Sequence, residues 1–213
     1  MSTRSVVGVA IGVICLATSA YAVPITPSPT IVSGNMTFNN FTSCNVVGGV
    51  SLTCAQIDVS AHTSVSPPDP TNGDFGIRIQ AAFNAGTTTE DVIFQYDGHI
   101  TGGVFHDASM YFNGTAVSSV TEDIFNLANG DLIGHLAVSN PGSSTASIVL
   151  TENATDIRMV KDIGLDFSSP GPTVLSIVDQ QFSQTRVPEP ASLALLGVGL
   201  LALGIGRHRR KTV

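Results

Sequence analysis

Histidines and acids are the residues of this chain best suited to metal binding, and they are closest together in the stretch GHITGGVFHD. This stretch places His99 seven residues before His106, with Asp107 next in the chain. On a single strand an odd separation puts two side chains on opposite faces, so a shared metal would require a turn at Gly102-Gly103. Histidines beside turns are usually surface residues. We therefore predict no metal site and no cofactor.

Carboxyl groups are the other candidates for chemistry, since fifteen of them lie between Asp58 and Asp179. A glycosidase needs only two, about 5 to 10 Å apart. Binding clefts are commonly lined by aromatic side chains, but the chain has no Trp and, after residue 22, only Tyr96 and Tyr111 as tyrosines. The segment DPTNGD at 69–74 departs from the spacing of a calcium loop. The motifs of serine hydrolases, zinc proteases and P-loop enzymes are absent. We predict no catalytic residues.

Two cysteines remain once residues 1–22 are set aside, Cys44 and Cys54. An even number in an exported chain predicts a disulfide. Two cysteines with no nearby histidine are too few ligands for zinc. The segment Asn45 to Leu52, with Gly48-Gly49 in its middle, predicts a tight hairpin that the bridge closes at its base.

Short strands account for most of the remaining interior. Apolar and polar residues alternate from Phe75 to Ala81, and similar patterns recur along the chain. Val117 to Asn126 is compatible with a strand or a single helical turn. The spacing predicts an all-β, antiparallel β-sandwich of jelly-roll or immunoglobulin-like type. The further strands are placed around 92–96, 110–112, 132–139, 145–150, 157–167 and 174–182, and the turns at Asn72-Gly73, Asp97-Gly98, Asn113-Gly114, Asn129-Gly130 and Pro141-Gly142.

The first 22 residues have the layout of a secretory signal peptide. Arg4 precedes an apolar stretch from Val6 to Ala17, and the small-x-small pattern Ala20-Tyr21-Ala22 follows. We predict cleavage by signal peptidase after Ala22. An uncleaved N-terminal anchor is the alternative, and the stretch is short for a span of about 20 residues. One domain is predicted between the two ends, at 23–186.

The last 27 residues predict a second targeting signal. Ala191 to Gly206 is an uncharged, apolar run just under the usual length of a spanning helix, about 17 residues or more. Basic residues stay on the cytoplasmic side of a membrane and can extend a short span by reaching to its interface. We predict a single transmembrane helix followed by a basic membrane stop, made of Arg207, Arg209, Arg210 and Lys211.

A proline-rich tetrapeptide precedes the apolar run, and the order of the three parts is specific. The tetrapeptide is Val187, Pro188, Glu189 and Pro190. Together with the apolar run and the basic end it resembles the PEP-CTERM sorting signal of Gram-negative bacteria, here at 187–213. The resemblance implies export, transient anchoring in the inner membrane, and processing near Pro188-Glu189-Pro190 by an exosortase. Delivery to the cell surface or the exopolysaccharide matrix would follow.

The charge of the mature region narrows the possible partners. Between Val23 and Val187, four strong bases against fifteen acids leave a net charge of −11. Such a surface repels nucleic acid and anionic lipid. The resemblance implies a surface or matrix protein associated with exopolysaccharide and biofilm, and the absence of catalytic motifs and the shortage of aromatic residues predict that it is non-enzymatic. The alternative is a secreted carbohydrate-active enzyme that uses paired carboxylates.

Overall fold

The chain folds into an all-β unit in the computed structural model, which describes residues 22–48, 52–63, 75–84, 88–114, 118–166 and 174–186. Within these ranges the predicted all-β fold is confirmed. The elements are β1 (Val23–Pro24), β2 (Ile31–Ser33), β3 (Met36–Gly48), η1 (Cys54–Gln56), β4 (Asp58–Thr63), β5 (Phe75–Asn84), β6 (Glu90–Ile100), β7 (Gly103–Gly114), β8 (Ser118–Asn126), β9 (Leu132–Asn140), β10 (Thr145–Ala154), β11 (Asp156–Leu165) and β12 (Val174–Arg186).

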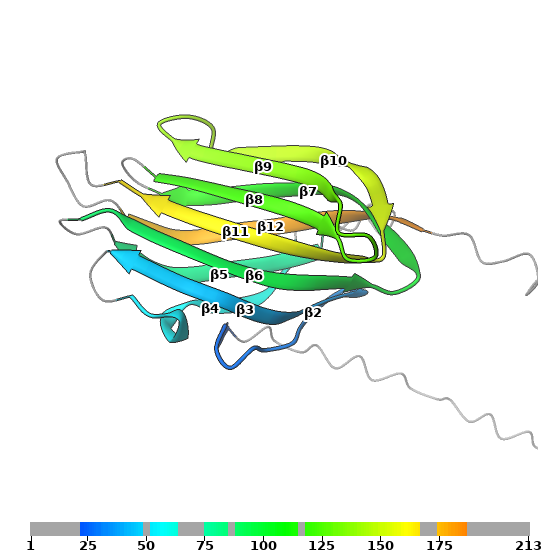
Figure 1. Cartoon of the computed structure of the whole chain (residues 1–213), viewed down its shortest axis with the longest axis horizontal. Coiled ribbons are helices and arrows are strands. Elements are labelled where there is room, and N and C mark those ends of the chain that lie inside the picture. Colours follow the sequence, from blue (N-terminus) through cyan, green and yellow to red (C-terminus); the bar gives the residue numbers. More distant parts are fainter. Residues whose placement is uncertain are drawn as a thin grey trace, which may run out of the picture.

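The strands form two six-stranded sheets packed face to face (Figure 1). The first, called sheet A, has the order β1-β4-β5-β12-β7-β10. The second, called sheet B, has the order β2-β3-β6-β11-β8-β9. Neighbouring strands in both sheets run antiparallel. The predicted antiparallel β-sandwich is therefore confirmed. After β3, the strands that follow each other in the chain and are also neighbours in one sheet are β4–β5 and β8–β9.

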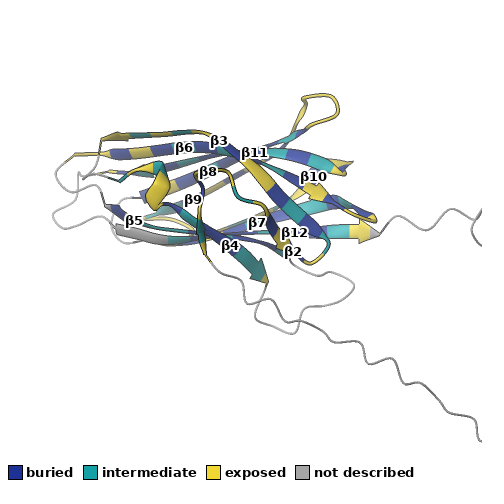
Figure 2. Cartoon of the chain, turned by 90° about the horizontal axis from the view of Figure 1, so that it is seen from below, coloured by how far each residue is buried: buried dark blue, intermediate teal, exposed yellow. Residues whose placement is uncertain are grey.

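The alternation of side chains along each strand builds the core between the sheets. In β6 the residues Val92, Phe94 and Tyr96 are fully buried, whereas their neighbours are more exposed (Figure 2). Phe38 of sheet B stacks on Phe182 of sheet A, with ring centroids 5.8 Å apart. Burying one such side chain contributes about 1.5–3 kcal/mol to folding. These contacts hold the two sheets together.

The strands agree with some of the local predictions and disagree with others. The segment expected to be strand or helical turn at Val117–Asn126 is strand β8 over its described part. Asn129-Gly130 lies in the turn between β8 and β9, as predicted. The turn predicted at Asp97-Gly98 is wrong, because both residues lie inside β6, paired with β11. In the sequence alone, a glycine inside a strand cannot be distinguished from a glycine in a turn.

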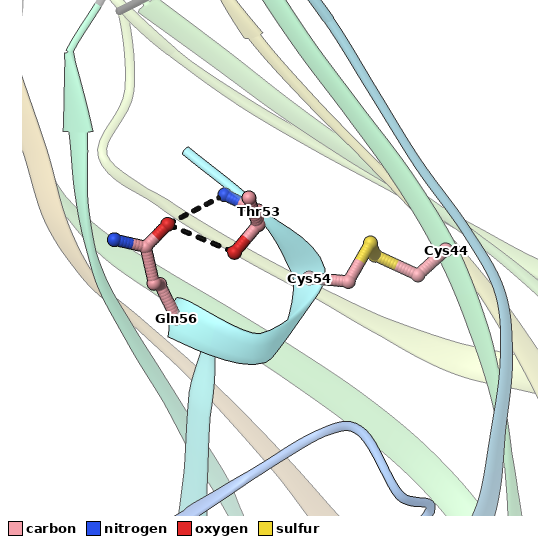
Figure 3. Close-up of a disulfide and its surroundings, with 4 residues drawn as sticks. All are labelled: Cys44, Thr53, Cys54 and Gln56. Atoms are coloured by element: carbon pink, nitrogen blue, oxygen red, sulfur yellow. Dashed lines mark hydrogen bonds between the residues drawn. A yellow bond between two sulfur atoms is a disulfide. The ribbon is translucent and has the colours of Figure 1, made fainter. Parts of the chain in front are cut away.

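The disulfide between Cys44 and Cys54 is present, with Cα atoms 6.1 Å apart (Figure 3). The predicted hairpin around it is wrong. Cys44 lies within the long strand β3, and Cys54 begins the 3-10 helix η1 that leads into β4. The bridge therefore connects a strand of sheet B to the entry of a strand of sheet A. Its loop of sequence separation 10 predicts an entropic stabilisation of about 2–3 kcal/mol.

The 3-10 helix beside the disulfide has its own polar anchor. Thr53 donates hydrogen bonds from its backbone N–H and its hydroxyl to Oε1 of Gln56, at 2.8 and 2.9 Å (Figure 3). These bonds satisfy groups that a helix start leaves unpaired. The short turn that carries Cys54 is thus held in place by the disulfide on one side and by this cap on the other.

The predicted targeting segments lie outside the described residues, apart from Ala22. This holds for the signal peptide 1–22, the tetrapeptide Val187–Pro190, the apolar run Ala191–Gly206 and the four basic residues after it. In the ranges that the structure does describe, no helix has the length and apolar character to cross a membrane.

Candidate ligand-binding surface

The outer face of sheet A carries two rows of side chains that cross five strands in register. One residue comes from each of β4, β5, β12, β7 and β10 in both rows, and all ten belong to the face opposite the core. The first row is Ser60, Arg78, Asp179, Tyr111 and Thr145; the second is His62, Gly76, Gln181, Ser109 and Ser147. Antiparallel pairing brings residues that are far apart in sequence side by side. The fold thus collects one continuous polar strip.

A hollow of about 400 Å³ opens on this strip where β12, β7 and β10 meet. Most of its lining belongs to the outward-facing residues of the two rows. The lining consists of Ser109, Met110, Tyr111, Thr145, Ala146, Ser147, Asp179 and Gln181. Hydroxyl and amide groups therefore dominate the side chains around the hollow, with one aromatic ring among them.

Asp179 forms the rigid centre of the strip and is 7% exposed. Arg78 donates two hydrogen bonds to it, Nε to Oδ1 at 2.7 Å and Nη2 to Oδ2 at 2.8 Å. A planar, two-bonded pair of this kind fixes both side chains. The pairing with Asp179 raises the pKa of Arg78. The two opposite charges cancel locally, so the hollow is bordered by a neutral, ordered ion pair.

His62 lies on the far side of Asp179, with Nε2 at 3.7 Å from Oδ2. Burial lowers the pKa of His62; the charge of Asp179 opposes this effect and the charge of Arg78 adds to it. An imidazole with a lowered pKa is neutral at pH 7. It therefore adds a hydrogen-bonding group to the strip without adding a charge.

Tyr111 is the aromatic residue of the hollow, and 44% of its surface is exposed. Thr145 and Asp179 are its register partners on the two neighbouring strands. An exposed ring among hydroxyl and amide groups suits a ligand with both C–H and O–H groups on its surface. A sugar ring has this composition, because its C–H face can pack on an aromatic ring while its hydroxyls form hydrogen bonds.

The histidines singled out in the sequence do not form a shared site. His99 lies on β6 of sheet B with Nδ1 at 2.7 Å from Oδ1 of Asp156, whereas His106 lies on β7 of sheet A with Nδ1 at 3.2 Å from Oδ1 of Asn153. Among the described residues, no group of three or more His, Cys, Asp or Glu side chains could hold a metal ion. The segment DPTNGD at 69–74 is outside the described ranges.

One pair of carboxyl groups does interact directly, on the outer face of sheet B. Asp162 shares a hydrogen bond with Asp91, and burial, together with that bond and the charge of Asp91, raises the pKa of Asp162 to about 6. Two carboxyl groups that share one proton are closer than the roughly 5 Å that a retaining glycosidase requires. This pair therefore does not supply the geometry of a glycosidase.

The Asp162 pKa leads to a testable pH dependence. Its folded-state value lies above the ordinary 3.8, so the folded state binds the proton more tightly, and this stabilisation is lost as the pH rises through about 6. Asp162→Asn keeps the bond without the charge. We expect the variant to exceed the wild type by about 1 kcal/mol at pH 8, a value reduced for solvent screening. Urea unfolding at pH 4 and 8 measures this; an equal difference at both pH values would contradict it.

Sequence reasoning missed the strip as a site. Arg78 and Asp179 are 101 residues apart, and the sequence does not show that β5 and β12 are neighbours. The available signal was the parity of the strands, meaning the alternation of inward and outward residues. Arg78 alternates with the buried Ile77 and Ile79, and Tyr111 with the buried Met110 and Phe112. Parity assigns these residues to an outer face but does not show which of them meet.

Comparisons with known proteins identify a sorting motif and a general structural similarity. A family model for the PEP-CTERM protein-sorting motif matches residues 186–211. None of the curated proteins matches. Among solved structures, TmCBM61 in complex with β-1,4-galactotriose is 10% identical with a TM-score of 0.36, covering 68% of this chain and 90% of its own. The C-terminal domain of a chitobiase from Bacteroides fragilis is 12% identical with a TM-score of 0.34, covering 75% and 99%. TM-scores this low carry no argument about ligand or activity.

The fold and the motif together define an exported β-sandwich with a C-terminal membrane-anchoring sorting signal. The chain carries the PEP-CTERM protein-sorting motif, which confirms the resemblance found in its last residues. This motif implies processing by an exosortase.

Proposed function

We propose that the mature sandwich is a non-enzymatic protein of the cell surface or extracellular matrix that holds exopolysaccharide and supports a biofilm. The observation that carries this is the strip on sheet A, where the exposed Tyr111 adjoins hydroxyl and amide side chains around one hollow. Exosortase processing near Pro188-Glu189-Pro190 would release the chain from its transient inner-membrane anchor.

The charge of the mature region supports a neutral polymer as the ligand. With a net charge of −11 between Val23 and Val187, the surface repels phosphate-rich polymers and anionic lipid. The groups around the hollow bear hydroxyls and amides, and its one acid is paired with Arg78. Single contacts of this kind are weak, but many copies on one polymer multiply them by about 10² to 10⁴.

Binding to the host strain's own extracellular polysaccharide tests the proposal. Affinity electrophoresis of the exported protein should show retardation, and Tyr111→Ala should weaken it about two- to tenfold, because one aromatic contact contributes about 0.5–1.5 kcal/mol. Val32→Ala is the matched control, since Val32 is a 62% exposed apolar residue of sheet B. Equal binding by the wild type and Tyr111→Ala would contradict the assignment of this face.

An assay on the same polysaccharide separates the enzyme alternative from the proposal. Incubation should leave polymer length and reducing ends unchanged. Release of reducing ends that disappears when one or two carboxylates are replaced would establish turnover and overturn the non-enzymatic function.

A further inference from the structure

Lys161 has an unusual position for a lysine. It is the only lysine between Val23 and Val187, and its side chain is completely buried between the two sheets. Lysines are almost always at the surface, and a buried one needs compensating partners. The mature region has a single lysine, and that lysine is in the core. This placement indicates a specific role for its amine.

The amine of Lys161 contacts groups from both sheets. Its Nζ lies 2.7 Å from Oε2 of Glu122, which is also fully buried, and 3.2 Å from Oε1 of Gln180 on β12. Met110 Sδ is 3.3 Å away. Tyr96 donates its hydroxyl hydrogen to Oε2 of Glu122 at 2.9 Å. An amine, a carboxyl group and a primary amide thus meet in a site closed to water.

Two polar atoms of this cluster are left without hydrogen bonds. Glu122 Oε1 and Gln180 Nε2 are buried and have no partner among the described residues. Such atoms are rare in native cores, because each costs about 1–3 kcal/mol. The unpaired Nε2 belongs to the amide whose oxygen faces the amine of Lys161. Loss of this nitrogen would therefore break no hydrogen bond among the described residues.

The protonation states in the cluster favour nucleophilic attack. Burial lowers the pKa of Lys161, an effect that its contact with Glu122 opposes. Burial also raises the pKa of Tyr96, with further increases from Glu122, so its hydroxyl remains a donor. Burial of this kind disfavours the charged form of an amine. A neutral amine has the free electron pair that attack on an amide carbon requires.

We propose that Lys161 and Gln180 are joined by an intramolecular isopeptide bond, formed by the folded chain itself. The Nζ of Lys161 attacks Cδ of Gln180, and a C–N bond forms. Glu122 takes one proton from Nζ and passes it to Nε2; the bond between Cδ and Nε2 breaks and ammonia leaves. The product is a secondary amide plus ammonia, so the step needs no oxidant, water or other co-reactant.

The bond would link the two sheets through β11 and β12. Strand β12 is the last described strand, ending where the sorting motif begins at residue 186. A load on the chain through that end acts first on β12. Covalent attachment to β11 would pass the load to the other sheet. The proposal itself does not depend on the polysaccharide ligand, because every group involved is in the core.

Peptide mapping of the exported protein tests the bond directly. Trypsin cleaves after Arg158, Lys161 and Arg186 in this region, but not after an acylated lysine. With the bond, we expect one species covering 159–186 whose mass is lower by one ammonia. Recovery of 162–186 as a separate peptide of unaltered mass would overturn the proposal. A species in which 159–186 is joined to 79–158 with the loss of one water would also overturn it, since Glu122 would then be the acceptor.

Two variants test the roles of the residues. Glu122→Gln keeps the shape of the site but removes the proton carrier, so the two separate peptides should appear in place of the joined one. Gln181→Glu is the matched control, because Gln181 is the next residue of β12 and faces outward; its joined species should persist. A joined species in Glu122→Gln would contradict the role of Glu122, and the wild-type map decides on the bond even if this variant fails to fold.

Discussion

Glu122→Leu is expected to destabilise the sandwich by about 3–5 kcal/mol. Glu122 and Lys161 are register partners on β8 and β11, and both side chains are 0% exposed. Removing the carboxyl group leaves the amine buried beside Gln180 and Met110 without a charged partner, which is among the largest effects of a single substitution. It also leaves the Tyr96 hydroxyl without its acceptor. Urea unfolding followed by far-UV circular dichroism measures the loss.

A double variant separates the buried amine from other causes. Glu122→Leu combined with Lys161→Met replaces both polar groups by apolar side chains of similar length. We expect it to be more stable than Glu122→Leu alone by about 3 kcal/mol, because no polar amine then remains in the core. Neither variant is expected to form the isopeptide bond, because Glu122→Leu lacks the proton carrier and Lys161→Met lacks the amine, so the loss of the bond affects both equally. Equal stability of the two would show that the buried amine is not the source of the loss.

The Lys161 and Glu122 positions also show what could be predicted from the sequence. Strand β11 alternates strictly, and Ile157, Met159, Ile163 and Leu165 are its buried apolar residues. Period-two alternation places Lys161 in the same inward series. Glu122 likewise falls between the buried Val120 and Ile124 on β8. The alternation of inward and outward residues therefore predicts that both Lys161 and Glu122 point into the core. It does not predict that they meet, because their contact depends on the register of β8 against β11.

Strand β3 shows where the alternation of inward and outward residues fails to predict the structure. Its sequence MTFNNFTSCNVVG is largely polar after Phe38, and its pairing with β6 shifts twice, between Asn39 and Thr42 and between Thr42 and Asn45. Asn40 and Ser43 have positive φ angles of 54° and 55°. Such irregularities add residues to one strand and break the alternation. The hairpin predicted near Cys44 was wrong because Gly48-Gly49 was interpreted as its turn, whereas β3 continues to Gly48 and Cys54 begins a 3-10 helix. The disulfide prediction depended only on the cysteine count and the compartment.

Gly76→Ala is the second large effect, expected to destabilise the fold by about 3 kcal/mol. Gly76 lies on β5 opposite Gln181 of β12. An alanine Cβ at this position would be 1.8 Å from the backbone carbonyl oxygen of Gln180. A backbone atom cannot rotate away as a side chain can, so β5 and β12 must separate. Overpacking of this kind typically costs about 1–3 kcal/mol, and more where backbone has to move.

Gly164→Ala is the matched control for that effect. Gly164 also lies inside a strand, β11, but its added Cβ would meet only the side-chain hydroxyl of Ser119, at 3.2 Å. That hydroxyl can rotate, and alanine also lowers the entropy of the unfolded chain, so a change below about 1 kcal/mol is expected. Since β12 carries both Asp179 and Gln180, a separation of β5 from β12 in Gly76→Ala should also lengthen the Arg78–Asp179 pair and weaken the proposed polysaccharide binding. Full stability in Gly76→Ala would mean that the two strands are farther apart in solution, and the close β5–β12 contact would then be wrong.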